Sequence, residues 1–579
     1  MPPDTSLNEY DQSCYRAVRR VEVENRMQFP KTSAIHFCLL LATWYLSPAS
    51  LFAQPPAGKY DALNKMELEK CLAKLPKGTR HSFTMMPLRD GVKLATDVFL
   101  PPTGDGPWPV MLLRTPYSRF DSRPVNEMGD MPCVLVCQNQ RGRYGSEGTL
   151  PRDTFLNEVA DGHDTIEWCA KQKWSNGKVA MWGPSGHGVS PSNAIWSKSP
   201  HLVAVNVNIT GDDAYLHWCF YNGARRAMYT WMGQRNQQVK DWPRPTTIPF
   251  DLQARETFLK ENATNNKTYF LARGGWYDLF SEAALDSFAA LAPAGRAFVS
   301  MHPGGHGPIG GDLKYPSRNF PKDAQMPTIK QLMTGAEPKA VKSILAYYLM
   351  GDTLDTKAPG NLWKTTSVWP VPHTPTDYYL HADGTLSTRK PAAKDASLTY
   401  DYDPKDPVPS IGGNYALGVK SGPLDQRPLK DRKDVLRFVS EPLAEPVTIT
   451  GKIWADLRFA SDAPDTMFVV KLVDIYPDGY EAMVRESAGL ARYHQGLNKA
   501  APLQKGKTYT LKLDLWSTAL VFNKGHRIAV HVTSSSKEAY EVHPNTYDPA
   551  PSIDQARVAR NTLFLSGDRA SRLILPVIP

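Results

Sequence analysis

The sequence predicts an α/β domain that carries an inserted helical cap, followed by a C-terminal β-sandwich. Three observations predict this fold class. Short apolar runs alternate with helical segments between residues 84 and 310, an aromatic-rich stretch interrupts them at 212–265, and alternating apolar and polar residues dominate the last third. A chain of 579 residues has room for two to four domains of ordinary size.

The predicted strands of the α/β domain are short runs rich in branched residues and bounded by Pro or Gly. Such runs suit strands that are buried on both faces of a mostly parallel sheet. A segment at 164–172 has helical character. We therefore assign the α/β domain to residues 54–211 and 266–361, with strands at 93–100, 109–114, 133–138, 202–209, 268–274 and 296–302.

Residues 212–265 are rich in aromatic side chains and lean toward helix, so we predict a helical cap over the carboxyl edge of the sheet. From residue 362 to 579 the pattern is that of antiparallel strands. Leu511 and Leu513 face one way while Lys512 faces the other, as a half-buried strand requires. Strands predicted at 447–454, 510–516 and 527–533 together indicate a β-sandwich.

The first 53 residues are predicted to be a leader. An apolar run from Phe37 to Leu46 is too short to span a bilayer, which needs ~20 residues, but it has the length of a signal-peptide core. Small residues follow it up to Ala53, and an internal start at Met27 gives a leader of ordinary length. We expect an exported soluble protein, periplasmic or extracellular. An uncleaved N-terminal membrane anchor is the alternative.

Composition excludes several classes of function. The 67 basic and 58 acidic side chains are mixed along the chain, and no nucleic-acid partner is expected because such proteins cluster their basic residues. No metal-binding motif is present, and we expect no metal or organic cofactor. The cysteines beyond the leader are too sparse for a disulfide framework, although one or two bonds are left open: Cys71, Cys133, Cys137, Cys169 and Cys219.

The strongest local signal is VAMWGPSGHG at residues 179–188, where a strand runs into small residues and helix-leaning sequence follows. A nucleophile elbow needs small residues on both sides of a serine at a tight strand-to-helix turn. Ser185 meets this need, and the helix N-terminus behind it favours a developing oxyanion. Ser185 is therefore a candidate nucleophile. A plain glycine turn is the alternative.

A serine nucleophile needs an imidazole base and a carboxylate that orients the base. After an elbow of this kind the partners follow in the order Asp or Glu, then His, each on a loop after a strand. Asp278 in GGWYD and His306 in HPGGHG have this placement. His302 is the rival base, or else a core or supporting histidine, and a surface acid is the alternative for Asp278. His187 is expected to be structural.

These segments resemble the α/β-hydrolase acyl-hydrolases, a family that includes cocaine esterase, α-amino-acid ester hydrolases, glutaryl acylases and X-Pro dipeptidyl-peptidases. The resemblance covers about residues 84–579. It rests on PLRDGVKLATDVFLP, RTPYSR, QRGRYGSEG, DGHDTIEW and WSNGKVAMWGPSGHG, followed by GGWYD and HPGGHG. In the last third, SEPLAEPVTITG and LDLWSTALVFNKGHRIAVHVTSSS resemble the family's jelly-roll domain. The resemblance implies an α/β-hydrolase core and a C-terminal jelly roll.

The resemblance also implies the role of each site residue. The family pattern G-x-S-Y-x-G places the nucleophile at Ser185, and its tyrosine is replaced here by Gly186, whose backbone N–H is implied as one oxyanion donor. The hydroxyl of Tyr117 in RTPY is implied as the second donor. The family's aspartate and histidine fall on Asp278 and His306.

Several positions depart from the family's pattern. Asn139 stands where an acid is common, a change that we expect to be structural, and Gly304 stands where tryptophan is usual. The short stretch between Ser185 and Asp278 implies a small cap and a more open acyl pocket.

The acids near the site bear on the substrate. α-Amino ester hydrolases resemble one another in placing carboxylates just after the catalytic aspartate, where they hold an ammonium group. Here residues 279–281 carry none, and the next acid is Glu282. Asp212 and Asp213 are the remaining candidates, but we expect them to be solvated loop acids. We therefore favour acyl groups that need no α-ammonium.

The sequence thus predicts a serine hydrolase that cleaves ester or amide bonds of small acyl substrates through a Ser-His-Asp triad and an acyl-enzyme. An X-Pro-type dipeptidyl-peptidase or an α-amino acid ester hydrolase is the alternative. A distant alternative is a non-catalytic binding protein that uses the jelly roll. The expected partner is a small ester, amide or short peptide, and a homo-oligomer is left open.

Overall fold

The fold was analysed in a computed structural model. It describes residues 57–149, 156–227, 252–316, 318–322, 324–335, 342–355, 357–392, 394–415, 420–548, 553–567 and 570–579. The predicted leader at 1–53 and residues 228–251 of the predicted cap lie outside these ranges.

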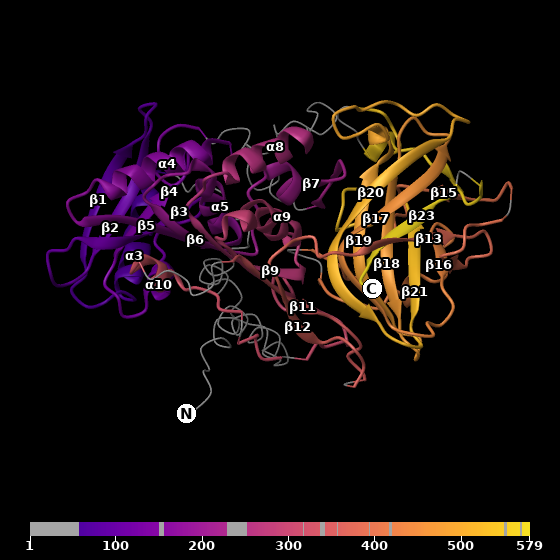
Figure 1. Ribbon diagram of the computed structural model, residues 1–579. Coiled ribbons are helices and arrows are strands. Elements are labelled where there is room, and N and C mark those ends of the chain that lie inside the picture. The colour runs from indigo at the N-terminus through magenta and orange to yellow at the C-terminus, as the bar shows by residue number, and fades with distance from the viewer. Residues whose placement is uncertain are drawn as a thin grey trace, which may run out of the picture. The chain divides into compact units, whose positions relative to one another are not determined.

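A mixed sheet of ten strands forms the first domain (Figure 1). Neighbours from β4 to β11 run parallel, whereas β1, β2 and β12 are antiparallel to their neighbours. This sheet confirms the predicted α/β domain. In spatial order the strands are β1 (Arg80–Pro87), β2 (Lys93–Leu100), β4 (Val134–Asn139), β3 (Trp108–Thr115), β5 (Ser175–Pro184), β6 (Leu202–Asn208), β9 (Tyr269–Tyr277), β10 (Ala297–Gly305), β11 (Ile344–Leu349) and β12 (Leu362–Thr366).

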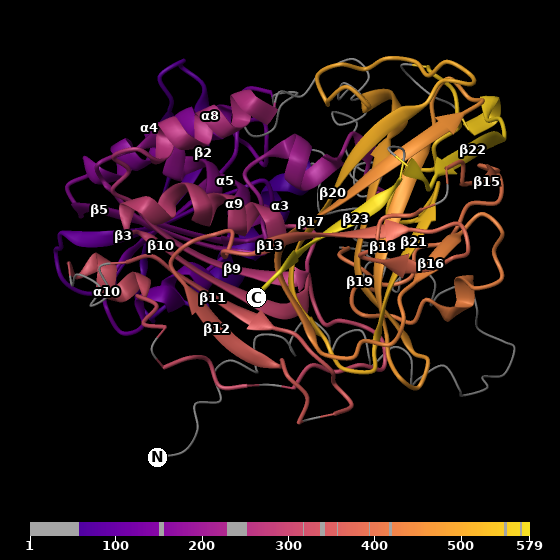
Figure 2. The same ribbon diagram turned by 45° about the vertical axis from the view of Figure 1, so that its right-hand side comes forward.

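Helices cover both faces of this sheet (Figures 1 and 2). Val110 and Leu112 of β3 pack into the core on one face, and Met111 and Leu113 pack into the core on the other. The strands are therefore apolar without alternation, as their sequence indicates. The first face carries α4 (Leu156–Ala170), α5 (Val189–Ala194), α8 (Leu252–Ala263) and α9 (Ser281–Leu291), and the second carries α3 (Ala57–Leu72) and α10 (Ile329–Met333).

The described part of the predicted cap contains little ordinary helix before α8. A π-helix (Ala214–Cys219) begins after Asp213, whose side chain accepts a hydrogen bond from the Leu216 N–H. It leads into a hairpin of β7 (Phe220–Tyr221) and β8 (Ala224–Arg225). π-Helical turns are rare and often lie at functional sites.

The second domain consists of two β-sheets that share one core, as the sequence predicts. Phe459 and Leu513 of the larger sheet belong to the same buried cluster as Phe468 and Val530 of the smaller one. The larger sheet contains β13 (Thr374–Leu380), β14 (Leu386–Ser387), β15 (Ser397–Tyr402), β17 (Val447–Ser461), β20 (Tyr509–Phe522), β22 (Ala559–Phe564) and β23 (Arg572–Val577). The smaller contains β16 (Leu436–Val439), β18 (Met467–Ile475), β19 (Glu481–Leu490) and β21 (Arg527–Thr533).

The two domains are joined by backbone pairing as well as by the core. The N–H of Met350, which follows β11, donates to the Ala519 carbonyl over 3.0 Å, and Val521 N–H donates back to Met350 over 2.9 Å. The first sheet continues through β12 to Thr366, past the predicted domain end at 361, because β12 pairs with β11. Its pattern of exposed and half-buried residues is that of an edge strand, which resembles a sandwich strand in sequence.

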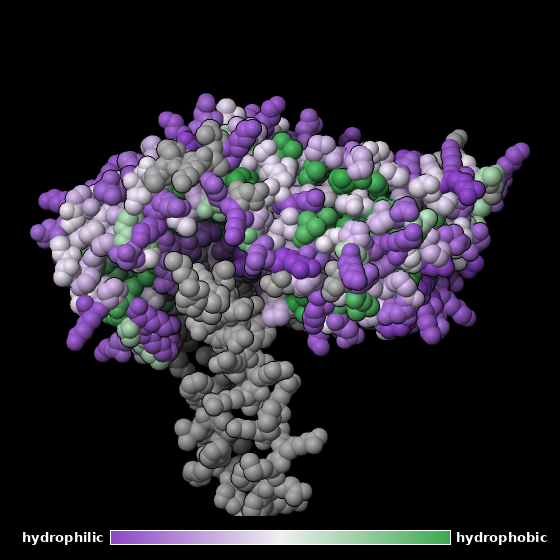
Figure 3. Space-filling view, turned by 60° about the horizontal axis from the view of Figure 1, so that its bottom comes forward, coloured by the Kyte–Doolittle hydropathy of each residue, from purple (hydrophilic) through white to green (hydrophobic). Residues whose placement is uncertain are grey.

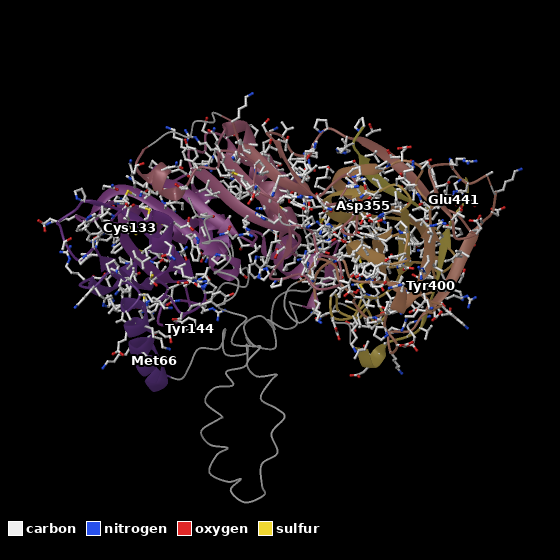
Figure 4. The ribbon with its side chains drawn as sticks, turned by 90° about the horizontal axis from the view of Figure 1, so that it is seen from below. Met66, Cys133, Tyr144, Asp355, Tyr400 and Glu441 are labelled. Atoms are coloured by element: carbon white, nitrogen blue, oxygen red, sulfur yellow. The ribbon has the colours of Figure 1, made fainter. Side chains whose placement is uncertain are left out.

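The described cysteines are all free thiols, so none of the disulfides that the sequence left open is formed among them. Four of the five are buried, and Cys133, in the first domain, is half-buried (Figure 4). Within the described ranges, no helix is both long and apolar enough to cross a membrane. On the face shown in Figure 3, hydrophobic side chains form small separate patches among hydrophilic ones.

Candidate active site

Ser185 lies at a strained turn between β5 and α5. Its φ is +49°, a left-handed conformation that costs free energy in residues with a side chain. The turn needs Gly183, because a Cβ there would lie 2.2 Å from the carbonyl oxygen of His187. The chain then passes through a short 3-10 turn (Ser185–Gly188) into α5. This is the geometry of a nucleophile elbow.

Ser185, His306 and Asp278 form one chain of hydrogen bonds. The Ser185 Oγ lies 2.9 Å from the His306 Nε2, and the His306 Nδ1 lies 2.8 Å from the Asp278 Oδ2. Asp278 is fully buried, and its Oδ1 accepts the Phe280 N–H over 2.7 Å. A buried carboxylate held in this way fixes the tautomer and orientation of an imidazole that serves as base to a serine.

Tyr117 and Gly186 meet beside Ser185. A Cβ on Gly186 would lie 2.0 Å from the Tyr117 hydroxyl oxygen, so only glycine admits the phenol at this place. Burial raises the pKa of Tyr117 to about 12, and its hydroxyl therefore stays protonated and able to donate. The two predicted oxyanion donors are thus neighbours in space.

Asn139 supports the loop that carries Tyr117. Its Nδ2 donates to the carbonyl oxygens of Thr115 (3.2 Å) and Tyr117 (2.5 Å), and its Oδ1 accepts the Arg119 Nη1 (3.0 Å). An ionised carboxylate has no proton to donate to either carbonyl. The departure from the family's acid therefore has a structural role, and that departure was the only sequence signal for it.

The histidine hydrogen-bonded to the Ser185 Oγ is His306, whereas His302 and His187 are held in other surroundings. Burial lowers the pKa of His302 to about 3, and its ring packs edge-on against Trp363 with centroids 4.8 Å apart. A bulge in β10 between His302 and Gly305 separates it from the loop of His306. Burial likewise lowers the pKa of His187 to about 4, and its ring lies edge-on to Tyr117 with centroids 4.9 Å apart.

Asp212 and Asp213 are tied into the protein and are not the solvated acids that the sequence led us to expect. Asp212 is buried and forms ion pairs with Arg255 (2.6 Å) and His217 (3.2 Å). Burial raises its pKa, but Arg255 and His217 outweigh that effect and hold the pKa well below the usual range. Asp213 caps the π-helix. Their charges are therefore already compensated.

Aromatic side chains adjoin the imidazole. The Phe280 ring lies 5.5 Å from the His306 ring and 4.6 Å from the Trp218 ring, centroid to centroid. Phe280 and Trp218 belong to a buried cluster that also contains Phe220 of β7. Near His306, a Cβ added to Gly304 would meet no described atom within 4 Å. The part of the site formed by the π-helix and the start of α9 is therefore apolar.

Within the described residues, no cluster of three or more His, Cys, Asp or Glu side chains could hold a metal ion. The groups brought together at Ser185 are those that acyl transfer requires: a nucleophile, a base with its orienting acid, and two hydrogen-bond donors.

Comparison with known proteins gives the same picture for both domains. Residues 90–255 match the family model of the X-Pro dipeptidyl-peptidases (S15 family), and residues 328–574 match that of the X-Pro dipeptidyl-peptidase C-terminal non-catalytic domain. Cocaine esterase from Rhodococcus sp. (strain MB1 Bresler) is 29% identical over 575 residues, which covers 86% of this chain and 98% of the esterase.

Two solved structures share the fold over most of the chain. An aminopeptidase from a marine sediment archaeon (Thaumarchaeota archaeon) has a TM-score of 0.72 at 23% identity, covering 87% of this chain and 99% of its own. An α-amino acid ester hydrolase has a TM-score of 0.68 at 23% identity, covering 86% of this chain and 97% of its own.

Proposed function

Because the chain belongs to the serine hydrolase family that includes cocaine esterase and the X-Pro dipeptidyl-peptidases, we propose that Ser185, His306 and Asp278 are its catalytic triad. The protein is a serine hydrolase that acts on ester or amide bonds. The observation that carries the assignment is the hydrogen-bonded chain from the Ser185 Oγ through His306 to the buried Asp278, with Ser185 at a left-handed turn.

In the proposed mechanism, the Ser185 Oγ attacks the carbonyl carbon while the His306 Nε2 accepts its proton. Asp278 stabilises the imidazolium that forms. The Tyr117 hydroxyl and the Gly186 N–H donate to the oxyanion of the tetrahedral intermediate, and each such donor is worth ~10²–10³ in rate. His306 then protonates the leaving alcohol or amine as its bond to carbon breaks. Water, deprotonated by His306, attacks the acyl-enzyme and releases the acid and free Ser185.

The walls of the site favour an uncharged acyl group. The Phe280 ring packs against His306 and the Trp218 ring packs against Phe280, whereas Asp212 and Asp213, the candidates for binding an ammonium group, are already bound within the protein. Gly304, at the position where the family resemblance implies tryptophan, leaves room near His306. We therefore assign small, uncharged acyl esters as preferred substrates, with amides as slower ones.

An X-Pro dipeptidyl-peptidase is the second candidate, since both matching family models carry that name. Such an enzyme must bind the free α-ammonium group of its peptide. Hydrolysis of an alanyl-prolyl anilide faster than that of short p-nitrophenyl esters, at equal concentration, would favour this candidate over the esterase.

Labelling with a fluorophosphonate tests the triad. The probe reacts with an activated serine, so wild type should be labelled and the Ser185→Ala and His306→Ala variants should not. Ser192→Ala, in the next helix, is the matched control and should label normally. Unchanged labelling of Ser185→Ala would show that another residue is the nucleophile, and a folded wild type that does not react would favour the binding-protein alternative.

Export and domain limits form a separate part of the proposal. Residues 1–53 are proposed to direct export, residues 212–265 to form the cap, and the predicted segment 362–579, apart from β12, to form a jelly roll. Sequencing the N-terminus of protein recovered outside the cytoplasm tests the leader. A new N-terminus near Gln54 is expected, and an intact Met1 would contradict cleavage.

A further inference from the structure

The support of Asp278 comes largely from the second domain. Helix α9 begins at Ser281, three residues after Asp278. A displacement of its first turn would therefore also displace the Asp278 carboxylate. Glu282 lies in this first turn and is buried. An acid in such a place must have its oxygens satisfied, because a buried unpaired carboxylate is costly.

Strands β17 and β20 satisfy Glu282. One of its oxygens accepts the backbone N–H of Ser517 over 2.5 Å, and the other accepts the Ser517 hydroxyl over 3.1 Å. The Lys452 Nζ lies 3.0 Å from Glu282 and 2.9 Å from Asp514. Burial lowers the pKa of Lys452, but Asp514 and Glu282 outweigh this and hold it well above the usual range. Lys452 is therefore a half-buried ammonium that binds two carboxylates.

The two strands depart from regular geometry where they reach Glu282. Register in the β17–β20 ladder shifts between Lys452 and Trp454, which marks a bulge. In β20, Trp516 has a φ of +70°, a left-handed conformation that is strained for a tryptophan, and Ser517 follows it. Bulges and strained residues redirect backbone and side-chain groups and are retained next to functional sites. Both irregularities adjoin a group that binds Glu282.

Two arginines hold the chain on either side of Asp278. Arg226, whose guanidinium lies 4.6 Å from the centre of the Trp516 ring, donates to the carbonyl of Leu279 over 3.2 Å. Arg485 of β19 donates to the carbonyls of Trp276 and Ser517. The backbone is thus fixed before and after Asp278 by groups linked to the same part of β20.

We propose that Glu282, held by Lys452 and Ser517, is a positioning residue that sets the Asp278 carboxylate against His306. In this arrangement residues of the second domain support the catalytic machinery of the first. The inference rests on the proposed function in one respect, the assignment of Asp278 as the triad acid.

Removing the ammonium tests the proposal. In Lys452→Met, kcat for p-nitrophenyl acetate should fall about 10–100-fold with KM changed less than about twofold, because misplacement of a catalytic group by ~1 Å costs this much. Lys452→Arg should restore most of kcat. The matched control is Lys512→Met, which removes the same charge from an exposed position of β20, where the ammonium lies 4.3 Å from the centre of the Trp454 ring. Lys512→Met should retain wild-type kcat.

A second variant guards against loss of folding. Lys452→Met leaves the buried Glu282 and the half-buried Asp514 without their shared cation, so the double variant Glu282→Gln/Lys452→Met is also measured, with the fraction of folded protein taken from circular dichroism. A folded double variant with reduced kcat supports the proposal. Wild-type kcat in the folded single and double variants would overturn it, as would an equal loss in Lys512→Met.

The two failures are distinguishable. If the triad assignment is wrong, Ser185→Ala still reacts with the fluorophosphonate. If only the positioning role is wrong, wild type is labelled at Ser185 and the Lys452→Met protein is labelled at the same rate.

Discussion

The serine and the aspartate of the proposed triad are supported in different ways. Ser185 is fixed by its own short segment, where Gly183 admits a backbone contact that any side chain would block and the strained turn leads straight into a helix. Asp278 lies in the short turn between β9 and α9, whose neighbouring residues are anchored by Glu282, Arg226 and Arg485 to distant parts of the chain. One position depends on local stereochemistry, and the other depends on tertiary contacts.

This contrast indicates which substitutions should disturb Ser185 and which should disturb Asp278. Small changes of shape within a few residues should disable the serine side, whereas the aspartate side should respond to charge changes more than 150 residues away in sequence, at Lys452. The following substitutions break or sharpen that contrast, in order of decreasing expected effect.

The largest loss of kcat is expected for substitution of Asp278, the last member of the hydrogen-bonded chain. In Asp278→Asn the side chain can still accept the Phe280 N–H, but it no longer holds the His306 tautomer that takes a proton from Ser185. A comparable change lowers kcat ~10⁴-fold in serine hydrolases. Steady-state kinetics should show this loss with little change in melting temperature. Asp286→Asn, in the helix α9 that follows Asp278, is the control, and an equal loss there would argue against a specific role for Asp278.

Gly186→Ala should lower kcat through a steric clash beside Ser185, without a change of charge. The added methyl group would lie 2.0 Å from the Tyr117 hydroxyl and must displace it, so kcat should fall ~10²-fold or more, as for loss of one oxyanion donor. Gly304→Ala adds the same methyl group without a described contact and should react like wild type. If Tyr117→Phe and Gly186→Ala each lower kcat, the double variant should lose little more. Full additivity would show that the two changes act independently.

Asn139→Asp replaces the neutral amide that supports the Tyr117 loop with a charged carboxylate. The carboxylate would face the carbonyl oxygens of Thr115 and Tyr117 without a proton to donate, and leaving such contacts unmade costs about 1–3 kcal/mol. We expect a fall in kcat of about tenfold and a lower melting temperature. Asn176→Asp, at an exposed position near the start of β5, is the matched control. Wild-type kinetics in Asn139→Asp would show that the Asn139 amide is not needed to position Tyr117.

The smallest effect concerns pH and the contact between domains. Burial lowers the pKa of His526, but Asp474 (2.9 Å) and Asp352 (3.2 Å) outweigh it and raise the pKa above its usual value. A raised folded-state pKa stabilises the protein below the unfolded value of ~6.5, and this contribution is lost as pH rises through the folded value. The free energy of unfolding in urea should fall more between pH 6 and pH 9 in wild type than in His526→Gln. An equal pH dependence in both proteins would contradict the assignment.

Much of the fold and the site could be predicted from local sequence. Branched apolar runs marked most strands of the first sheet, and β2 has the predicted bounds of 93–100. Ser185 was predictable because an elbow needs glycines at fixed offsets, and Asp278 and His306 because each follows a parallel strand. The assignment of these three as catalytic residues remains a prediction, for which the geometry is the present support.

What could not be predicted depends on contacts between distant residues. The choice between His302 and His306 turns on a bulge in β10, and the pairing of Asp212 turns on Arg255 in a later helix. The ion pair between Lys452 and Glu282 has no local signature at all, because the sequence does not show which strand of the second domain faces α9. The edge strand β12 was missed as part of the first sheet for the same reason.

The position of β23 has a consequence for how the protein is made. This strand, Arg572–Val577, is inserted between β13 and β17 in the interior of its sheet, where it pairs with both. The sheet that contains Lys452 and Ser517 therefore cannot close until residues through Val577 have left the ribosome. If Asp278 depends on that sheet, a nascent chain carries every residue of the triad and yet stays inert, and hydrolysis begins only after synthesis of the last strand.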